Sequence, residues 1–296
     1  MPDIALRFNK DMLVLSTPLD YQLEAQGFTE PTDREYVALC EPELIEEAYK
    51  LEKVMETPCF VTATEGITRA RLAHSRFENQ AGEMARIAYE TGAVFSPQHL
   101  LAAIGSTGLP LDPTSASSLK QSKQQYHDAV QALIEFLFDG IYFCGFENLD
   151  DAQCALMGAR AIYDGPILIT LTPSHDGSFS DGRTLEEGVC LCDEYGASVI
   201  GVSSNAAPDV LYSFASRMVA ATDKPLMVDF VVNRKDPRQF EPTAENPYPT
   251  PDSIFEPALV LREKGIQFLR ATGAATPSYT GSLIAAVMGH DVNFNV

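Results

Sequence analysis

Eight short apolar runs, each followed by a longer helical pattern, recur from one end of the chain to the other. The runs are apolar almost throughout instead of alternating with polar residues, which is typical of strands buried on both faces of a parallel sheet. The predicted strands cover residues 12–16, 59–63, 100–104, 140–144, 167–172, 198–202, 226–230 and 266–269.

The stretches between these runs carry helix start signals. Pro42 and Pro251 are prolines suited to a first helical turn, and Pro277 plays the same part before the last helix. Asn148 and Thr184 precede acidic residues and are predicted N-caps, because their side chains can accept hydrogen bonds from free backbone N–H groups. Strands and helices therefore alternate along the whole chain.

About eight strand–helix units in 296 residues match the usual size of a (β/α)₈ barrel, the TIM barrel of the α/β class. An open doubly wound sheet is the alternative, and it is disfavoured because no Gly-x-Gly-x-x-Gly turn follows a predicted strand. The Pro-rich stretch 236–251 is expected to be a long surface loop, and no linker or low-complexity tract divides the chain. We predict a single barrel domain over residues 1–296.

The composition argues against nucleic acid and membranes as partners and against a secreted protein. With 21 Lys+Arg against 41 Asp+Glu the net charge is −20, so nucleic acid and anionic membrane surfaces would repel the protein. No apolar run approaches the roughly 18–20 residues of a membrane span, and the first residues lack signal-peptide features. The six scattered cysteines indicate a reduced, cytoplasmic protein, with Cys190 and Cys192 on different sides of one helix. The oligomeric state stays open, a homo-oligomer included.

The chemistry of such a barrel is expected where its strands end. Polar residues at these positions are predicted to line a substrate site: Ser16, Thr62, Thr64, Thr172, Ser204, Asn233 and Thr272. Glu65 and Asp229 are acids beside buried strand ends, so either could hold a shifted pKa, although a structural hydrogen bond explains each equally well. Cys144 could act as a nucleophile or metal ligand, but packing is the simpler interpretation. His175 reads as a turn residue.

Several segments, in this order, form a recognisable set: CEPELI at 40–45, TATEGITRARL at 62–72, AIGSTG at 103–108, DGRT at 181–184, ASVIG at 197–201 and ATP at 275–277. The set resembles the homocysteine S-methyltransferase family, whose barrel also stands at the front of cobalamin-dependent methionine synthase. The matching family features are its PELI helix start, TNTF…R-x-R-L segment, SIGPTG loop, approach to the sixth strand and final TTP. The resemblance spans about residues 11–289 and implies a (β/α)₈ barrel and methyl transfer.

This sequence departs from the family at the metal-binding positions. The family is expected to hold zinc with one cysteine after the sixth strand and a Cys-Cys pair after the eighth, which activates the substrate's thiol as a thiolate. Here Ser204 stands at the first position and Thr272-Gly273 at the pair. Hydroxyl groups and a glycine cannot replace three thiolates, so the usual zinc site is expected to be absent and no metal ligands are assigned.

The substrate-holding positions depart as well. The family's Asp-Gly-x-x-Gly-Thr turn aligns with residues 16–21, which have neither the acid nor the glycines at the matching places. Cys144 stands where the family has a glutamate for the amino-acid ammonium, a charge-assisted bond worth roughly 1.5–3 kcal/mol. The family's Pro-Asn-Ala-Gly survives at best as Asn233. Homocysteine is therefore a doubtful substrate.

Two main hypotheses follow. The first is a zinc-independent methyltransferase with no tightly bound cofactor, which moves a methyl group to or from cobalamin on a separate corrinoid protein, or to an acceptor other than homocysteine. Glu65, Cys144 and Asp229 would then supply the acid–base or nucleophilic groups. The second is a non-catalytic paralogue that binds a ligand or partner protein at the former active-site face. An alternative metal site at Glu65, Cys144 and Asp229, or an unrelated barrel hydrolase or lyase, stays open.

Overall fold

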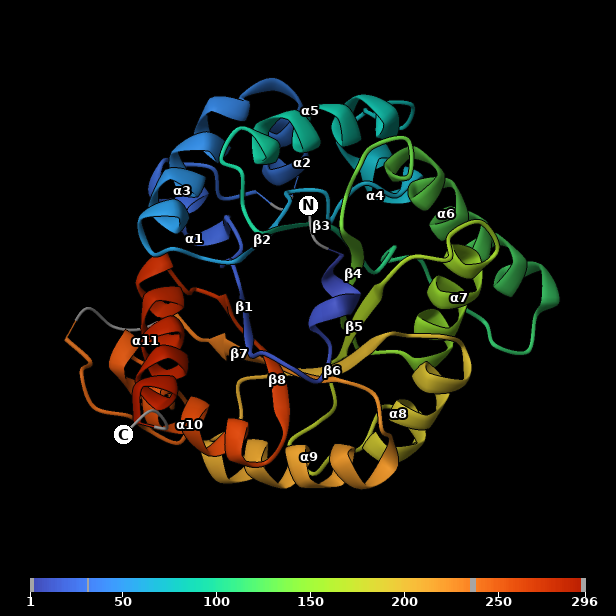
Figure 1. The fold of residues 1–296 in the computed structure, drawn as a ribbon. Helices are drawn as coiled ribbons and strands as arrows, with labels where there is room; N and C mark the ends of the chain where they lie inside the picture. The colour runs from blue at the N-terminus through green and yellow to red at the C-terminus, as the bar shows by residue number, and fades with distance from the viewer. Residues whose placement is uncertain (1–2, 31, 235–237, 294–296) are drawn as a thin grey trace.

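The predicted strands close into a barrel (Figure 1). The computed structural model describes residues 3–30, 32–234 and 238–293. Every strand pairs in parallel with its neighbours in sequence, and β1 also pairs with β8. The strands are β1 (Leu13–Leu15), β2 (Cys59–Val61), β3 (His99–Gly105), β4 (Gly140–Phe146), β5 (Ile167–Leu171), β6 (Val199–Ser204), β7 (Leu226–Val232) and β8 (Ile266–Gly273). The architecture is the (β/α)₈ barrel that the sequence predicts.

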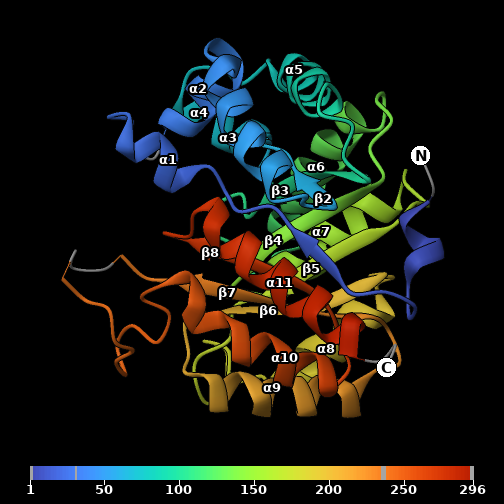
Figure 2. The ribbon, with the colours of Figure 1, turned by 60° about the vertical axis from the view of Figure 1, so that its left-hand side comes forward.

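Helices form an outer ring around the strands (Figures 1 and 2). The longer ones are α3 (Pro42–Val54), α5 (Ala81–Ala93), α6 (Ala116–Leu133), α7 (Leu149–Arg160), α8 (Leu185–Glu194), α9 (Pro208–Ala221), α10 (Phe255–Glu263) and α11 (Pro277–Asn293). Shorter elements are η1 (Ile4–Arg7), α1 (Asp20–Ala25), α2 (Asp33–Cys40), α4 (Arg69–His74) and η2 (Pro251–Ile254). None of the described helices is both long and apolar enough to cross a bilayer.

The predicted helix starts are confirmed. The Asn148 side chain accepts hydrogen bonds from the backbone N–H groups of the first turn of α7. Thr184 and Glu187 form a reciprocal capping box at the start of α8. Such caps depend on residues three positions apart or fewer, which is why the sequence alone reveals them. On α8, Cys190 is exposed and Cys192 buried, and all six cysteines are free thiols.

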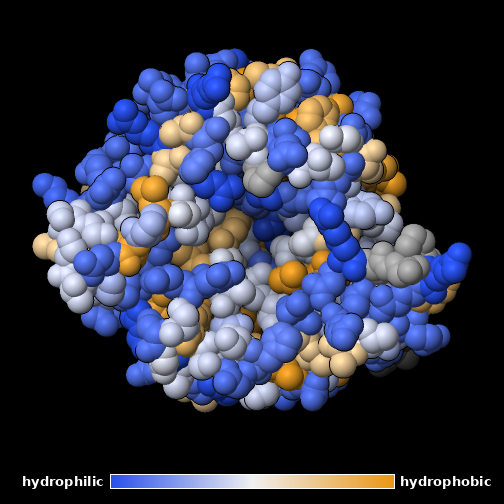
Figure 3. Space-filling view, turned by 180° about the vertical axis from the view of Figure 1, so that it is seen from behind, coloured by the Kyte–Doolittle hydropathy of each residue, from blue (hydrophilic) through white to orange (hydrophobic). Residues whose placement is uncertain are grey.

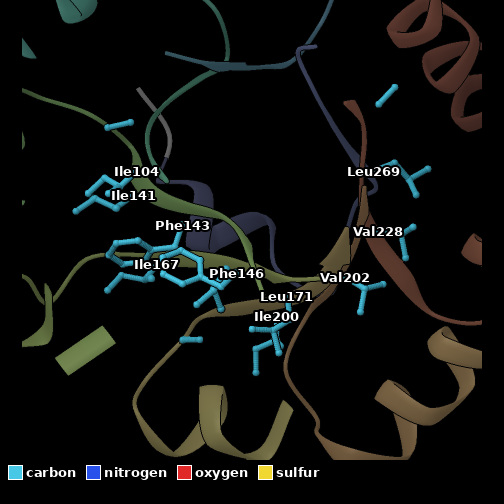
Figure 4. Close-up of a cluster of buried hydrophobic side chains, with 14 of the residues drawn as sticks. Ile104, Ile141, Phe143, Phe146, Ile167, Leu171, Ile200, Val202, Val228 and Leu269 are labelled. Atoms are coloured by element: carbon cyan, nitrogen blue, oxygen red, sulfur yellow. The ribbon is translucent and has the colours of Figure 1, made fainter. Parts of the chain in front are cut away.

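Two apolar layers hold the barrel together. The outer layer lies between the strands and the helices and includes Phe143, Ile200 and Leu269, as Figure 4 shows. The inner layer fills the barrel itself with the side chains of the alternate strand residues: Leu13, Leu15, Cys59, Val61, Leu101, Ala103, Tyr142, Leu168, Val199, Met227 and Phe268. Strands buried on both faces explain the near-continuous apolar runs of the sequence.

The short helix η1 closes the barrel at the end where the strands begin (Figure 1). Its residue Ile4 is fully buried and belongs to the inner apolar layer. The ring of Phe8 packs edge-on against Phe268, with 5.9 Å between the ring centroids. The lower end of the barrel is therefore packed with side chains, and the mouth lies at the opposite end.

The loop after β7 differs in part from its prediction as a surface loop. Its described residues 238–250 contain no helix or strand, and Asp236 and Pro237 lie outside the described residues. The second half of the loop is buried, because the hydroxyl of Tyr248 donates to the carbonyl of Ala206 at 2.7 Å. The hydroxyl of Tyr279 in α11 donates to the carbonyl of Tyr248 at 2.9 Å. This loop is thus anchored across the rim of the barrel.

Candidate active site

The mouth of the barrel is the face where the strands end, and Figure 3 shows a hollow near its centre. Asp229 of β7 pairs in register with Ser203 of β6 and Arg270 of β8. Two residues earlier, Met227 and Phe268 belong to the inner apolar layer. Since strand residues alternate between faces, Asp229, Ser203 and Arg270 point into the barrel as well.

Asp229 is a buried carboxylate with one oxygen engaged and one free. Its side chain is 2% exposed, and Tyr142 donates its hydroxyl to Oδ2 at 2.5 Å. Thr170 donates to the same oxygen at 3.5 Å, while Oδ1 has no hydrogen-bond partner. Burial raises the pKa of Asp229 to about 6, although the positive charge of Arg270 and the Tyr142 hydrogen bond oppose the shift. A carboxylate of this kind is mostly ionised at neutral pH and can still accept a proton.

Arg270 lies beside Asp229 in the barrel and is also 2% exposed. Its Nε donates to the carbonyl of Ser16 at 2.8 Å. Its guanidinium carbon lies 5.2 Å from the centroid of the Tyr142 ring, a cation–π distance. Its Nη2 is 3.9 Å from Oε1 of Glu65, which is too long for a hydrogen bond. Arg270 thus places a full positive charge at the floor of the mouth.

A line of alternating charges runs from Arg270 to the surface. Glu65 forms an ion pair with Arg34 of α2, and Arg34 forms a second one with Asp20 at the start of α1. Burial lowers the pKa of Arg34, but the carboxylates of Glu65 and Asp20 outweigh it and raise that pKa above its ordinary value. The line therefore ties the first two helices of the chain to the interior of the barrel.

Cys144 joins this group from β4, where it is half-buried. Its thiol donates to the carbonyl of Tyr142 at 3.5 Å. Burial, reinforced by the negative charge of Glu65, raises the pKa of Cys144 well above its ordinary value. A raised pKa favours the protonated thiol, which is a weaker nucleophile than the thiolate.

The predicted hydroxyl residues near β1 and β2 are buried and already bonded. Thr62 and Thr64 share a hydrogen bond of 2.8 Å, and Thr64 also donates to the carbonyl of Ala103 at 2.8 Å. Ser16 accepts a hydrogen bond from the backbone of Val61 at 2.9 Å. These contacts join neighbouring strands. The three hydroxyls therefore stabilise the wall of the mouth.

The remaining predicted site residues differ in which face of their strand they occupy and in how deeply they are buried. Ser204 lies on the outer face of β6 and accepts from the backbone of Ala206 at 3.1 Å, so Ser203 takes the inward position. Thr272 and Thr172 are half-buried at the ends of β8 and β5. Asn233 lies further out, where its Nδ2 donates to the carbonyl of Glu245 at 2.7 Å and its Oδ1 accepts from Asn205.

Two pockets open beside this rim, with volumes of about 540 Å³ and 400 Å³. Both are lined by Tyr21, Glu24, Asn233 and Arg234. A much smaller pocket below them is bounded by Asp20, Arg34, Glu65 and Arg270 among others. The Asp20–Arg34 ion pair borders the 400 Å³ pocket and the small one alike, so it stands between the open rim and Arg270.

Comparison with known proteins places this site in a family. Residues 13–268 match the sequence profile described as Homocysteine S-methyltransferase. The chain belongs to the homocysteine S-methyltransferase family. A comparison with curated protein sequences finds no significant match. The family assignment therefore depends on the profile, which covers most of the chain and agrees with the resemblance seen in the sequence.

Solved structures confirm the fold. The metallated form of the homocysteine methyltransferase MmuM from Escherichia coli superposes with a TM-score of 0.76 at 17% identity, over 94% of this chain and 96% of that one. Its apo form gives a TM-score of 0.70 at 16% identity, over 94% and 97% of the two chains. A complete pyruvate carboxylase from Rhizobium etli gives 0.53 at 14% identity, over 91% of this chain and 24% of the enzyme.

The donor groups at the family's expected zinc positions do not fit zinc in this member of the homocysteine S-methyltransferase family. Ser204 faces away from the barrel interior, Thr272 offers a hydroxyl and Gly273 has no side chain. Among the described residues, no group of three or more His, Cys, Asp or Glu side chains is placed to share a metal ion. Asp229, Glu65 and Cys144 come together as predicted but do not form such a group.

Four further residues at the mouth have no role predicted from the sequence: Arg270, Tyr142, Thr170 and Ser203. Arg270 and Ser203 do follow or end predicted strands, whereas Tyr142 and Thr170 lie inside them. Strict alternation along each strand is the signal that favours inward positions for these residues, but it requires the strand register, which the sequence does not fix. The mouth thus holds a buried acid, a buried arginine and several hydroxyls.

Proposed function

We propose that this family member transfers methyl groups without zinc, with Asp229 as the base that activates the acceptor. One observation carries the proposal. The barrel mouth, where this fold performs its chemistry, holds a buried carboxylate with a free oxygen, while the expected zinc positions hold Ser204, Thr272 and Gly273. A base inside the barrel replaces the metal as the means of making the acceptor nucleophilic.

The chemistry needs one proton transfer and one substitution. When the acceptor is a small molecule with a transferable proton, Oδ1 of Asp229 takes that proton, and the acceptor's lone pair forms a bond to the methyl carbon. The bond between that carbon and the donor breaks, and its electron pair leaves with the donor. Tyr142 and Thr170 hold Oδ2 and so leave Oδ1 as the oxygen available to the proton. The pKa of about 6 suits a base that works near neutral pH.

Donor and acceptor differ from those of the usual reaction. We propose that the methyl group moves to or from a corrinoid on a separate protein, or to a small-molecule acceptor other than homocysteine. Cys144 supports this, because it stands where the family is expected to hold an ammonium with a glutamate, and its protonated thiol carries no charge. The six free cysteines support a reducing location such as the cytoplasm.

Methyl transfer by the full chain tests the proposal. The protein is dialysed against a chelator, analysed for bound metal, and assayed with methylcobalamin as donor and a panel of thiols, amines and acids as acceptors. Asp229→Asn is expected to lower kcat/KM by roughly 10²–10⁴-fold, the usual contribution of a general base. Asp151→Asn is the matched control, because Asp151 is also buried but binds Ser106, Ser122 and Tyr126 outside the mouth.

Stoichiometric zinc that activity requires would contradict the metal-free chemistry, and full activity in Asp229→Asn would contradict the role of Asp229. One observation favours the second hypothesis, a non-catalytic paralogue. The side chain of Arg270 occupies the barrel floor, and the pocket next to it is small. Absence of transfer from every donor, together with ligand binding at the mouth, would support the paralogue.

A further inference from the structure

Three hydrogen bonds join side chains from three different loops at the rim of the barrel. Nδ2 of Asn233, after β7, donates to the backbone carbonyl of Glu245 at 2.7 Å. Nδ2 of Asn205, after β6, donates to Oδ1 of Asn233 at 3.3 Å. Oδ1 of Asn205 in turn lies 2.9 Å from Nε2 of His175, in the loop after β5. The three bonds form a continuous chain from His175 to the loop that follows β7.

The backbone carbonyl at one end sets the direction of every bond in this chain. A carbonyl only accepts, so Asn233 turns its amide nitrogen toward Glu245 and its oxygen toward Asn205. Asn205 then donates to that oxygen, which leaves its own oxygen facing His175. Two acceptors would repel each other, so Nε2 of His175 carries a hydrogen. The neutral ring is therefore the Nε2–H tautomer, with Nδ1 as the nitrogen that has no hydrogen.

The loop that carries His175 is itself firmly held. The Asp176 carboxylate accepts hydrogen bonds from the backbone N–H and the hydroxyl of Ser178, at 2.9 and 2.7 Å. Arg217 of α9 donates to the carbonyl of Asp176 at 3.1 Å. At the other end of the chain, Glu245 is exposed and belongs to a loop whose described residues contain no helix or strand. The hydrogen bonds therefore run from a braced loop to a loop without regular structure.

This chain of hydrogen bonds reaches the wall of the rim pockets. Asn233 lines both the 540 Å³ and the 400 Å³ pocket, as does the buried Val232 before it. The turn after β6 also receives a second contact from the loop after β7, since Tyr248 donates to the carbonyl of Ala206. Without a partner in Asn205, the amide of Asn233 would lose the contact that fixes its orientation. The shape of the pocket wall thus depends on residues from a neighbouring loop.

We propose that His175 is a positioning residue. As a fixed hydrogen-bond donor it orients the amides of Asn205 and Asn233, and so holds the loop after β7 and the wall of the rim pockets in place. This rests on the proposed function only in treating the rim as the entrance to the mouth. The role requires no proton transfer, because the neutral Nε2–H tautomer and the cation both carry a hydrogen on Nε2. It adds a purpose to a histidine that the sequence identifies only as a turn residue.

The tautomer is measured on the wild-type protein by ¹⁵N NMR of the histidine rings, at about pH 8 or above, where imidazole is neutral. His175 is expected to show the Nε2–H form. This signature depends on the direction of the hydrogen bonds, and a histidine that merely fills space at the rim would have no reason to select one tautomer.

Hydrogen exchange in the full chain measures the effect on the loop. The readout is the exchange of the Thr243 and Asn246 amides, which bond within the loop next to Glu245. His175→Ala removes the donor, and Asn205→Asp keeps the size of the side chain but has no hydrogen for Asn233. Both variants are expected to speed this exchange roughly two- to tenfold, the range that loss of one hydrogen bond gives.

His175→Gln is the conservative variant. Its side-chain amide can donate in place of Nε2, so exchange in the loop is expected to return to near the wild-type rate. His127→Ala is the matched control, because the ring of His127 contacts Gln124 and Asp128 of its own helix α6. Exchange of Thr243 and Asn246 should be unchanged in the control.

Three results would each overturn the proposal. The first is the Nδ1–H tautomer at His175 in the wild type. The second is unchanged exchange at Thr243 and Asn246 in His175→Ala or in Asn205→Asp. The third is exchange in His175→Gln as fast as in His175→Ala, which would show that the hydrogen bond does not hold the loop. An active Asp229→Asn would refute the proposed base and leave this proposal standing, because neither measurement involves methyl transfer.

Discussion

The lower and upper halves of the barrel interior are built from the same eight strands and have opposite chemistry. The lower half is closed by η1 and filled by apolar side chains such as Leu101, Met227 and Phe268. The upper half holds Asp229 and Arg270, both equally buried. The change takes one step of two residues along a strand, from Met227 to Asp229 on β7 and from Phe268 to Arg270 on β8.

This difference shows how the barrel separates stability from function. Inward apolar residues near the strand starts contribute to folding, whereas inward polar residues near the strand ends lose hydration and must be held by one another. The hydrogen bonds of Asp229 to Tyr142 and Thr170, and the stacking of Arg270 on Tyr142, are such mutual contacts. Substitutions in the two halves should therefore have different signs and different pH dependences.

The largest effect on stability is expected in the lower half. Phe268→Ala removes a fully buried ring that packs on Phe8, and should lower the free energy of unfolding by about 3–5 kcal/mol. Urea unfolding measures this. Thr272→Ala, on the same strand but at the half-buried upper end, should cost less than about 1 kcal/mol. A similar decrease in the free energy of unfolding in Phe268→Ala and Thr272→Ala would show that the lower half does not contribute more to stability than the upper half.

The next effect has the opposite sign. The folded pKa of Asp229 is about 6 against an ordinary 3.8, so the native protein keeps a proton that the unfolded chain releases within that interval. The contribution of Asp229 to stability therefore falls by about 3 kcal/mol as the pH rises from about 4 to about 6. Asp229→Asn has no group that titrates here. The free energy of unfolding of the variant minus that of the wild type should therefore increase over this pH range and then stay constant. A difference that does not vary with pH would contradict the buried charge.

The smallest effect concerns the Tyr142 hydrogen bond. Tyr142→Phe removes the hydroxyl that favours the ionised form of Asp229, so the pKa of Asp229 should rise further. In a methyl-transfer assay, the acid limb of kcat/KM should move to higher pH by roughly one unit, or about 1.4 kcal/mol. Tyr126→Phe is the matched control, because Tyr126 donates to Asp151 outside the mouth. An acid limb at the same pH in Tyr142→Phe and wild type would show that Tyr142 does not influence the pKa of the proposed base.

The fold could be predicted largely from sequence because its signals are local or repeated. Apolar runs identified all eight strands, and caps such as Asn148 and Thr184 marked helix starts. The buried end of the loop after β7 could not be predicted, since Tyr248 is anchored by Ala206 and Tyr279, which are distant in sequence. The closure of the barrel by η1 depends in the same way on Ile4 meeting a distant apolar layer.

The site was harder to predict. Functional groups of this fold lie at the carboxyl ends of the strands, and this rule placed Glu65, Cys144 and Asp229 at the mouth, where the structure has them near one another. It could not tell Ser203 from Ser204, because a shift of one residue exchanges the two faces of a strand. It also could not show which groups Arg270 meets inside the barrel, since Ser16 follows β1, Glu65 lies in the loop after β2 and Tyr142 belongs to β4.

The closure by η1 has a consequence for traffic through the protein. With Ile4 and Phe8 packed into the lower end, the described residues leave the mouth as the doorway through which the proposed substrates would reach Asp229. A methyl donor as bulky as a corrinoid on its carrier protein would cover that doorway completely. With such a donor, as proposed above, the small acceptor would bind before the donor docks, and the methylated product would leave after the donor departs. The four-residue helix η1, at the far end of the molecule, would then fix the order in which the proposed substrates bind.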